Sequence, residues 1–124
     1  MTKKVLIVDD EQNIAISVEY LMRREGFDVS VAKDGEEGLA MIRSTKPDLV
    51  LLDVMMPKMD GFQVCSEVRA DASLAGVRII MLTAKGREAE IEKGLSLGAD
   101  AYIPKPFSTS DLVSRVKALL EPKE

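Results

Sequence analysis

Five side chains of this 124-residue chain stand where apolar runs end, and together they could bind and transfer a phosphoryl group. Asp9 and Asp10 follow one run, Asp53 a second and Thr83 a third, while Lys105 comes just after a short fourth. Three carboxylates brought together repel one another, and Mg²⁺ offsets their charge while keeping positions for water or a phosphate oxygen. The lysine offers a point charge and the threonine a hydroxyl donor to a phosphoryl group. Asp53 needs no general base at pH 7, so it can act as the nucleophile.

Composition excludes several other functions. The chain has no histidine, so a histidine base, zinc ligand or phosphohistidine must come from a partner. Its single cysteine, Cys65, fits a reducing compartment and is expected to be a small core residue. A net charge of −4 with three Phe, two Tyr and no Trp disfavours direct nucleic-acid binding. No segment has the length of a signal peptide or membrane span, so a cytoplasmic protein without a membrane partner is expected.

Hydrophobic periodicity predicts an α/β fold. Unbroken apolar runs at 5–8, 49–52 and 79–82 are typical of strands buried on both faces of a parallel sheet. The alternating segment 28–32 predicts a strand at the sheet edge, and 101–103 predicts a short last strand. Helical patterns separate these strands over short connections, which is the signature of a parallel sheet with helices on both faces. The carboxyl ends of the strands should then bring the five side chains together at one edge, where such sheets bind ligands.

The expected helices differ in amphipathicity. The segment after residue 87 carries only Ile91 and Leu95 as a clear apolar pair, so this helix should be weakly packed. Ser108 and Asp111 predict a capping box at the start of the last helix. The segment 71–76 is expected to be a loop, and the methionines that follow Asp53 are expected to cover the core. The first predicted helix has its apolar residues at 14, 18, 21 and 22 and is stopped by Gly26, and the second ends before Pro47. The third spans about 61–70, the fourth about 87–97, and the last has its apolar face within 112–120.

Short motifs along the chain resemble those of the receiver domain of two-component response regulators. They are Val-Asp-Asp-Glu at 8–11, Leu-Asp-Val-Met-Met-Pro at 52–57, Asp-Gly at 60–61, Leu-Thr-Ala at 82–84 and Lys-Pro-Phe at 105–107. Each motif alone is weak evidence, but their shared order and spacing are highly specific. The resemblance runs from Lys4 to about Leu120. It implies a flavodoxin-like (βα)5 three-layer sandwich, with a parallel five-stranded sheet of order 2-1-3-4-5.

The resemblance also implies a domain plan and a metal site. Residues 1–124 would form a single receiver domain with its core at 4–120, and 121–124 would be a tail or the start of a linker. Asp53 would accept a phosphoryl group from a histidine of a sensor kinase or a phosphotransfer protein. Mg²⁺ would be held by Asp9, Asp10, Asp53 and the backbone carbonyl of Met55. Such a protein is a signalling phosphoacceptor, and its only expected catalysis is self-phosphorylation and self-dephosphorylation.

The same resemblance assigns the switch. Thr83 would bind the phosphoryl group, Lys105 would pair with it, and Tyr102 would turn inward as Thr83 moves. The bond before Pro106 would be cis. Phosphorylation would then change the surface formed by the fourth helix, last strand and last helix, and so signal to an effector protein or to a missing C-terminal effector domain. A phosphorylation-dependent homodimer is allowed, although Ala101 replaces the acidic residue common before the switch aromatic in regulators with winged-helix DNA-binding domains.

Two alternatives stay open at this point. A magnesium-dependent phosphatase can also use an aspartyl nucleophile, but such enzymes usually carry a second Asp two residues later as a general acid. That position is Met55 here, which argues against turnover of external substrates. The second alternative is a receiver-like interaction module that is not regulated by phosphorylation. The presence of Asp53, Thr83 and Lys105 together with the acidic pair argues against it.

Overall fold

Strands and helices alternate along the whole described part of the chain. The computed structural model describes residues 2–84 and 88–120, so the expected tail at 121–124 lies outside the described residues. In chain order the elements are β1 (Lys4–Val8), α1 (Gln12–Arg24), β2 (Asp28–Ala32), α2 (Gly35–Thr45), β3 (Leu49–Asp53), α3 (Gly61–Ala70), the 3-10 turn η1 (Ala72–Leu74), β4 (Arg78–Ala84), α4 (Glu88–Ser96), β5 (Ala101–Lys105) and α5 (Thr109–Leu120).

The strands form one parallel sheet in the order β2-β1-β3-β4-β5. This order confirms the flavodoxin-like fold. The alternating strand β2 lies at an edge, and the three fully apolar runs form the central strands β1, β3 and β4, as their patterns predict. Every residue of β3 is buried. Each large aliphatic side chain buried there stabilises the fold by about 1.5–3 kcal/mol.

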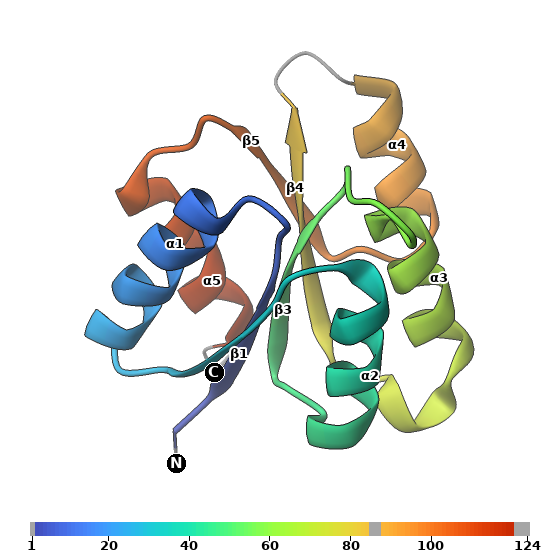
Figure 1. Ribbon diagram of the computed structural model, residues 1–124, viewed down its shortest axis with the longest axis horizontal. Helices are drawn as coiled ribbons and strands as arrows, with labels where there is room; N and C mark the ends of the chain where they lie inside the picture. The colour runs from blue at the N-terminus through green and yellow to red at the C-terminus, as the bar shows by residue number, and fades with distance from the viewer. Residues whose placement is uncertain (1, 85–87, 121–124) are drawn as a thin grey trace.

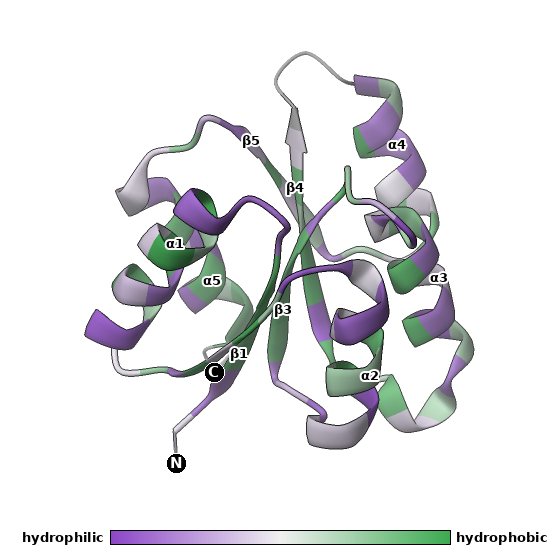
Figure 2. Cartoon of the chain, in the orientation of Figure 1, coloured by the Kyte–Doolittle hydropathy of each residue, from purple (hydrophilic) through white to green (hydrophobic). Residues whose placement is uncertain are grey.

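Helices cover both faces of the sheet. Figure 1 shows α1 and α5 on one face and α2, α3 and α4 on the other. One core therefore includes Val18, Leu112 and Val116 with the sheet residues that face them, and the other includes Ile42 and Val68 with theirs. In Figure 2 the strands between the helices are mainly hydrophobic, whereas the helices mix hydrophobic and hydrophilic residues. This is the amphipathic pattern of a three-layer sandwich.

Local side-chain hydrogen bonds fix where the helices begin. Asp34 Oδ1 accepts from the Glu37 backbone N–H at 2.8 Å at the start of α2. At the start of α3, Asp60 and Gln63 form a reciprocal capping box. The N–H of Asp111 donates to Ser108 Oγ at 3.1 Å, which confirms this half of the predicted box before α5. Such caps satisfy backbone donors that the first helical turn leaves unpaired.

Two predictions about loops are corrected. The segment 71–76 contains η1, because Asp71 Oδ1 accepts from the backbone N–H of Ser73 at 3.0 Å and starts a short turn that buries Leu74. The methionines after Asp53 do not all cover the core. Met56 is buried, but Met55 has 65% of its surface exposed.

The weak packing predicted for α4 is confirmed, but its apolar pair does not make the contact with the sheet. Leu95 is 43% exposed and Ile91 is only half-buried, so Leu95 does not face the core. The buried residue of the described helix is Gly94, where a Cβ would lie 3.4 Å from Cγ of Met81. The helix therefore meets the sheet through its smallest residue. Arg87, where the predicted helix starts, lies outside the described residues.

One expectation from composition is confirmed by the structure. Cys65 is fully buried in the core under α3, as predicted. Within residues 2–84 and 88–120, no helix combines the length and apolar character that crossing a membrane requires.

Candidate functional site

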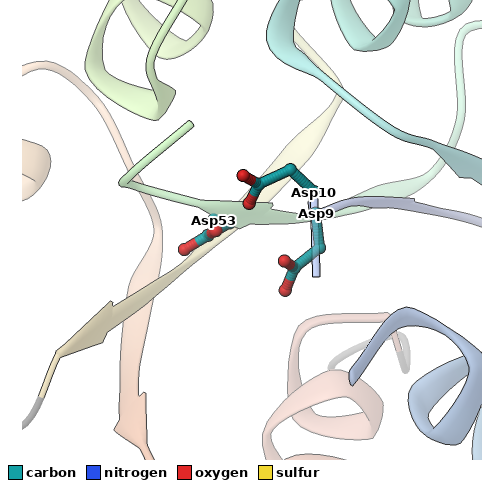
Figure 3. A group of neighbouring side chains, drawn as sticks. All are labelled: Asp9, Asp10 and Asp53. Carbon is teal, nitrogen blue, oxygen red and sulfur yellow. The ribbon is translucent and has the colours of Figure 1, made fainter. Parts of the chain in front are cut away.

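The carboxyl ends of β1 and β3 bring the acidic residues together. The parallel register pairs Val8 with Leu52, so Asp9 and Asp53 follow a paired position on neighbouring strands. Both are buried, at 2% and 4% exposure, whereas Asp10 is exposed. One carboxylate oxygen from each of the three residues lies within 4.8 Å of the other two (Figure 3). The convergence predicted from the strand ends is confirmed for this acidic cluster.

Lys105 reaches the acidic cluster from the end of β5. Its Nζ lies 3.2 Å from Asp53 Oδ1 and 3.3 Å from Asp9 Oδ2. A third carboxylate oxygen, Glu11 Oε1, also lies 3.3 Å from this ammonium. No role is predicted for Glu11 from the sequence, although it belongs to the unbroken acidic run of residues 9–11 at the same sheet edge. Three carboxylates therefore contact one ammonium, and the carboxylate of Asp10 belongs to the same acidic cluster.

This surplus of negative charge sets the ionisation of Asp53 and Lys105. Burial, reinforced by the negative charge of Asp9, raises the pKa of Asp53 from 3.8 to about 7, although the ammonium of Lys105 opposes the shift. Burial alone would lower the pKa of Lys105, but the charges of Asp53 and Asp9 outweigh it and raise that pKa. The carboxylate form of Asp53 is therefore costly until another cation joins the lysine.

Thr83 lies beside the acidic cluster on β4. The register pairs Asp53 with Leu82, so Thr83 stands one residue further toward the carboxyl edge. The residue is 1% exposed and its Oγ1 has no hydrogen-bond partner among the described residues. A buried hydroxyl without a partner is unfavourable. A group that brings oxygen acceptors to this edge would satisfy it.

A cleft of about 390 Å³ opens over Asp53 and Lys105, and Glu11 and Met55 contribute to its lining. Tyr102 is not among the lining residues. It pairs with Met81 on β4 and packs, partly buried, against the core on the α2–α4 face. Tyr102 therefore lies in β5 outside the lining of this cleft, and its inward movement stays a prediction. The Lys105–Pro106 peptide bond is cis, as the resemblance implied.

The loop between β3 and α3 is held close to Asp53 by two glycines. The N–H of Gly61 donates to the carbonyl oxygen of Val54 at 2.9 Å, and a Cβ on Gly61 would collide with the carbonyl oxygen of Asp53. A Cβ on Gly35 would likewise collide with the carbonyl oxygen of Met59. Only glycine permits these approaches. They keep this loop, which contains Met55, beside the acidic cluster, while the metal contact of the Met55 carbonyl stays a prediction.

The donor set fits a hard divalent cation. Three carboxylate oxygens lie within 4.8 Å of one another beside a cleft that can hold water or a phosphate oxygen. Mg²⁺ prefers such oxygen ligands and keeps several positions for water or phosphate. The unpartnered hydroxyl of Thr83 and the ammonium of Lys105 can then donate hydrogen bonds to an anionic group at the same edge.

Comparisons with known proteins show the family of the chain. The family model described as "Response regulator receiver domain" matches residues 5–117. The chain is 48% identical over all its 124 residues to the alkaline phosphatase synthesis transcriptional regulatory protein PhoP of Bacillus subtilis, and it spans about half (51%) of that relative's length.

Solved structures have the same fold. A putative response regulator from Chloroflexus aurantiacus is 38% identical, with a TM-score of 0.93 over 97% of this chain and 98% of its own. The receiver domain of the sensor histidine kinase PA1611 from Pseudomonas aeruginosa, solved with a magnesium ion coordinated in its active site cleft, is 27% identical, with a TM-score of 0.87 over 96% and 98% of the two chains. Because the family match spans nearly all of the sheet and its helices, this chain belongs to the response regulator receiver domains of two-component systems.

Proposed function

We propose that the chain is a phosphoacceptor that signals by accepting a phosphoryl group on Asp53. The observation that carries the proposal is the buried Asp53 carboxylate, which lies 3.2 Å from Lys105 and shares its sheet edge with Asp9 and Asp10. The donor is a phosphohistidine on a separate sensor kinase or phosphotransfer protein, because this chain has no histidine. We expect one transfer per signal rather than turnover of a substrate.

The transfer follows from the chemistry of the residues around Asp53. A carboxylate oxygen of Asp53 forms the new O–P bond while the N–P bond of the donor breaks, and the electron pair of that bond stays on the imidazole nitrogen. Lys105 pairs with a phosphoryl oxygen, and the free hydroxyl of Thr83 donates to another. When bound by Asp9, Asp10, Asp53 and the Met55 carbonyl, Mg²⁺ neutralises the charge that develops on the transferred oxygens.

The switch would use the side of the sheet that α4 covers. We infer that Thr83 moves toward the phosphoryl group and that Tyr102 turns inward behind it. Gly94 is the buried residue of the described part of α4, so little side-chain packing opposes a shift of this helix. The altered surface of α4, β5 and α5 then contacts a downstream protein, an effector domain or a second copy of the chain.

The setting of the chain is part of the same proposal. Residues 1–124 act as one receiver domain in the cytoplasm, where sensor kinases present their phosphohistidines. The relative PhoP is about twice as long as this chain and is named a transcriptional regulatory protein, which supports an effector domain beyond the receiver. We propose that nucleic-acid contact, where the pathway uses it, belongs to that effector and not to this chain, whose net charge is −4.

The test is the intact mass of the protein after incubation with phosphoramidate, whose P–N bond resembles that of phosphohistidine. With Mg²⁺ we expect a gain of one phosphoryl group, and without Mg²⁺ or in Asp53→Asn we expect none. Asp111→Asn removes an exposed carboxylate on α5 and serves as the matched control that should still gain the group. If neither phosphoramidate nor beryllofluoride modified the wild-type protein with Mg²⁺ present, the interaction-module alternative would replace this proposal.

A further inference from the structure

Glu11 occupies the N-cap of α1 but does not cap the helix. Its backbone is extended, with φ −87° and ψ 101°, and its side chain makes no cap hydrogen bond. Glutamate is not among the residues preferred at this position, where shorter side chains reach the free N–H groups. Its carboxylate instead extends toward the end of β5 and lies 3.3 Å from Lys105 Nζ.

The backbone of Glu11 is also part of the acidic cluster. Its N–H donates to Asp9 Oδ1 at 2.9 Å, which leaves Oδ2 of Asp9 facing Lys105 at 3.3 Å. One residue therefore orients a carboxylate of the site through its main chain and contacts the lysine of the site through its side chain. Both contacts come from the same strand-to-helix turn.

Lys105 and a divalent cation would compete for the same carboxylates. The ammonium contacts both Asp9 and Asp53, and these two residues belong to the cluster that could hold the metal. An ammonium has three donors, and the third contact of this one is Glu11. The side chain of Glu11 is 59% exposed at the rim of the cleft, so its attraction acts outward, away from the two buried carboxylates.

We propose that Glu11 is a positioning residue, which draws Lys105 toward the rim of the cleft and so makes it easier for Mg²⁺ to displace the ammonium from Asp9 and Asp53. This inference rests on the proposed function, because it concerns the metal that the transfer requires. Without the Glu11 carboxylate, Lys105 keeps only its contacts with Asp9 and Asp53, pairs with them more strongly, and is harder for the cation to displace. Mg²⁺ binding then weakens although none of its ligands has changed.

A simple charge effect makes a different prediction. Glu11 also adds negative charge near the site, and any negative charge there attracts a cation, though exposed charges are screened and contribute little. That effect depends on the charge alone and does not involve Lys105. Positioning requires both the reach of the glutamate and the presence of the lysine, so a double-mutant cycle separates the two explanations.

The experiment measures the Mg²⁺ dissociation constant by isothermal titration calorimetry for wild type, Glu11→Gln, Lys105→Gln and the double variant. Glu11→Gln should weaken binding roughly fivefold when Lys105 is present and less than about twofold when it is absent. Glu19→Gln, which removes a carboxylate from the exposed Glu19–Arg23 pair of the same helix, is the matched control and should leave binding unchanged.

Glu11→Asp is the second variant and needs no change at Lys105. It keeps the charge, but its shorter side chain is expected to cap α1 and lose contact with the lysine. Positioning predicts that it weakens Mg²⁺ binding nearly as much as Glu11→Gln. Equal effects of Glu11→Gln with and without Lys105, or a Glu11→Asp variant that binds like wild type, would overturn this inference and leave the proposed function intact. A wild-type chain that binds no Mg²⁺ would overturn both.

Discussion

The two ends of the sheet both gather charged side chains, but in opposite proportions. At the carboxyl end, Asp9 and Asp53 share the single ammonium of Lys105 with other carboxylates. At the amino end the ratio is reversed. There, Asp100 Oδ2 accepts from Arg69 at 2.9 Å and from the backbone N–H of Ile79 at 2.8 Å.

The carboxylate at the amino end is fully matched. Arg78 adds a second guanidinium 3.6 Å from Asp100 Oδ1, and Nε of Arg69 donates to the carbonyl oxygen of Gly98 at 2.8 Å. This amino-end cluster joins α3, the end of α4 and the first residues of β4 and β5. A matched cluster stabilises the fold, whereas the acidic cluster at the other end stores unfavourable charge that a cation and a phosphoryl group can use. The difference distinguishes a structural site from a functional one.

The largest expected effect is that removing charge at the carboxyl end stabilises the protein. The pKa of Asp53 is about 7 when folded and 3.8 without the fold, so the folded state holds its proton more tightly. The stability that this bound proton contributes is therefore present in full below pH 3.8 and is lost as the pH rises through 7. Without Mg²⁺, Asp53→Asn should raise the free energy of unfolding at pH 8 by up to about 4 kcal/mol and change it little near pH 4. Urea denaturation at the two pH values measures this.

The control for this prediction is Asp111→Asn, because Asp111 is exposed on α5 and pairs with Arg115 only at 3.7 Å. That change should alter the free energy of unfolding by no more than about 0.5 kcal/mol at either pH. If Asp53→Asn were destabilising at pH 8 in a metal chelator, the contrast between the two ends of the sheet would be lost.

The next effect has the opposite sign and belongs to the amino end. Asp100→Ala leaves the backbone N–H of Ile79 without its acceptor and removes the partner of Arg69. We expect the free energy of unfolding to fall by about 2–3 kcal/mol, because these groups are only partly exposed to water. Urea denaturation near neutral pH measures the loss, and Asp100→Asn, which keeps an acceptor oxygen, should recover part of it. A loss no larger than that of Asp111→Asn would contradict a structural role.

The contrast between the two ends also explains which charged clusters could be predicted from the sequence. Ligands bind at the carboxyl edge of a parallel sheet. The sequence alone therefore predicts that Asp53, Thr83 and Lys105, which stand at strand ends, lie together at this edge. No equivalent rule exists for the amino edge. Asp100 lies between two alanines, Ala99 and Ala101, and resembles any loop residue, although its contacts reach Arg69, 31 residues earlier in the chain.

The packing of side chains between α4 and the sheet also could not be predicted from the sequence. Leu95 stands at the right spacing from Ile91 for an apolar face, yet it is exposed because α4 approaches Met81 through Gly94. The position of a helix over a sheet depends on which residues permit close approach, and hydrophobic periodicity does not carry that information. The contact between Glu11 and Lys105 was not predicted because Glu11 stands past the strand end, at the N-cap of α1, where the sequence does not show which way its side chain points.

The smallest effect concerns the second guanidinium of the amino-end cluster. The side chain of Arg78 is 53% exposed and lies 3.6 Å from Asp100, while that of Arg69 is 22% exposed and lies 2.9 Å away. Arg78→Gln should therefore lower the free energy of unfolding by less than about 0.5 kcal/mol, and Arg69→Gln by about 1–2 kcal/mol. Urea denaturation of the two variants in parallel measures the difference. Equal losses would mean that Asp100 responds to the total positive charge around it, and that the stability of this end does not depend on one partly buried, hydrogen-bonded ion pair.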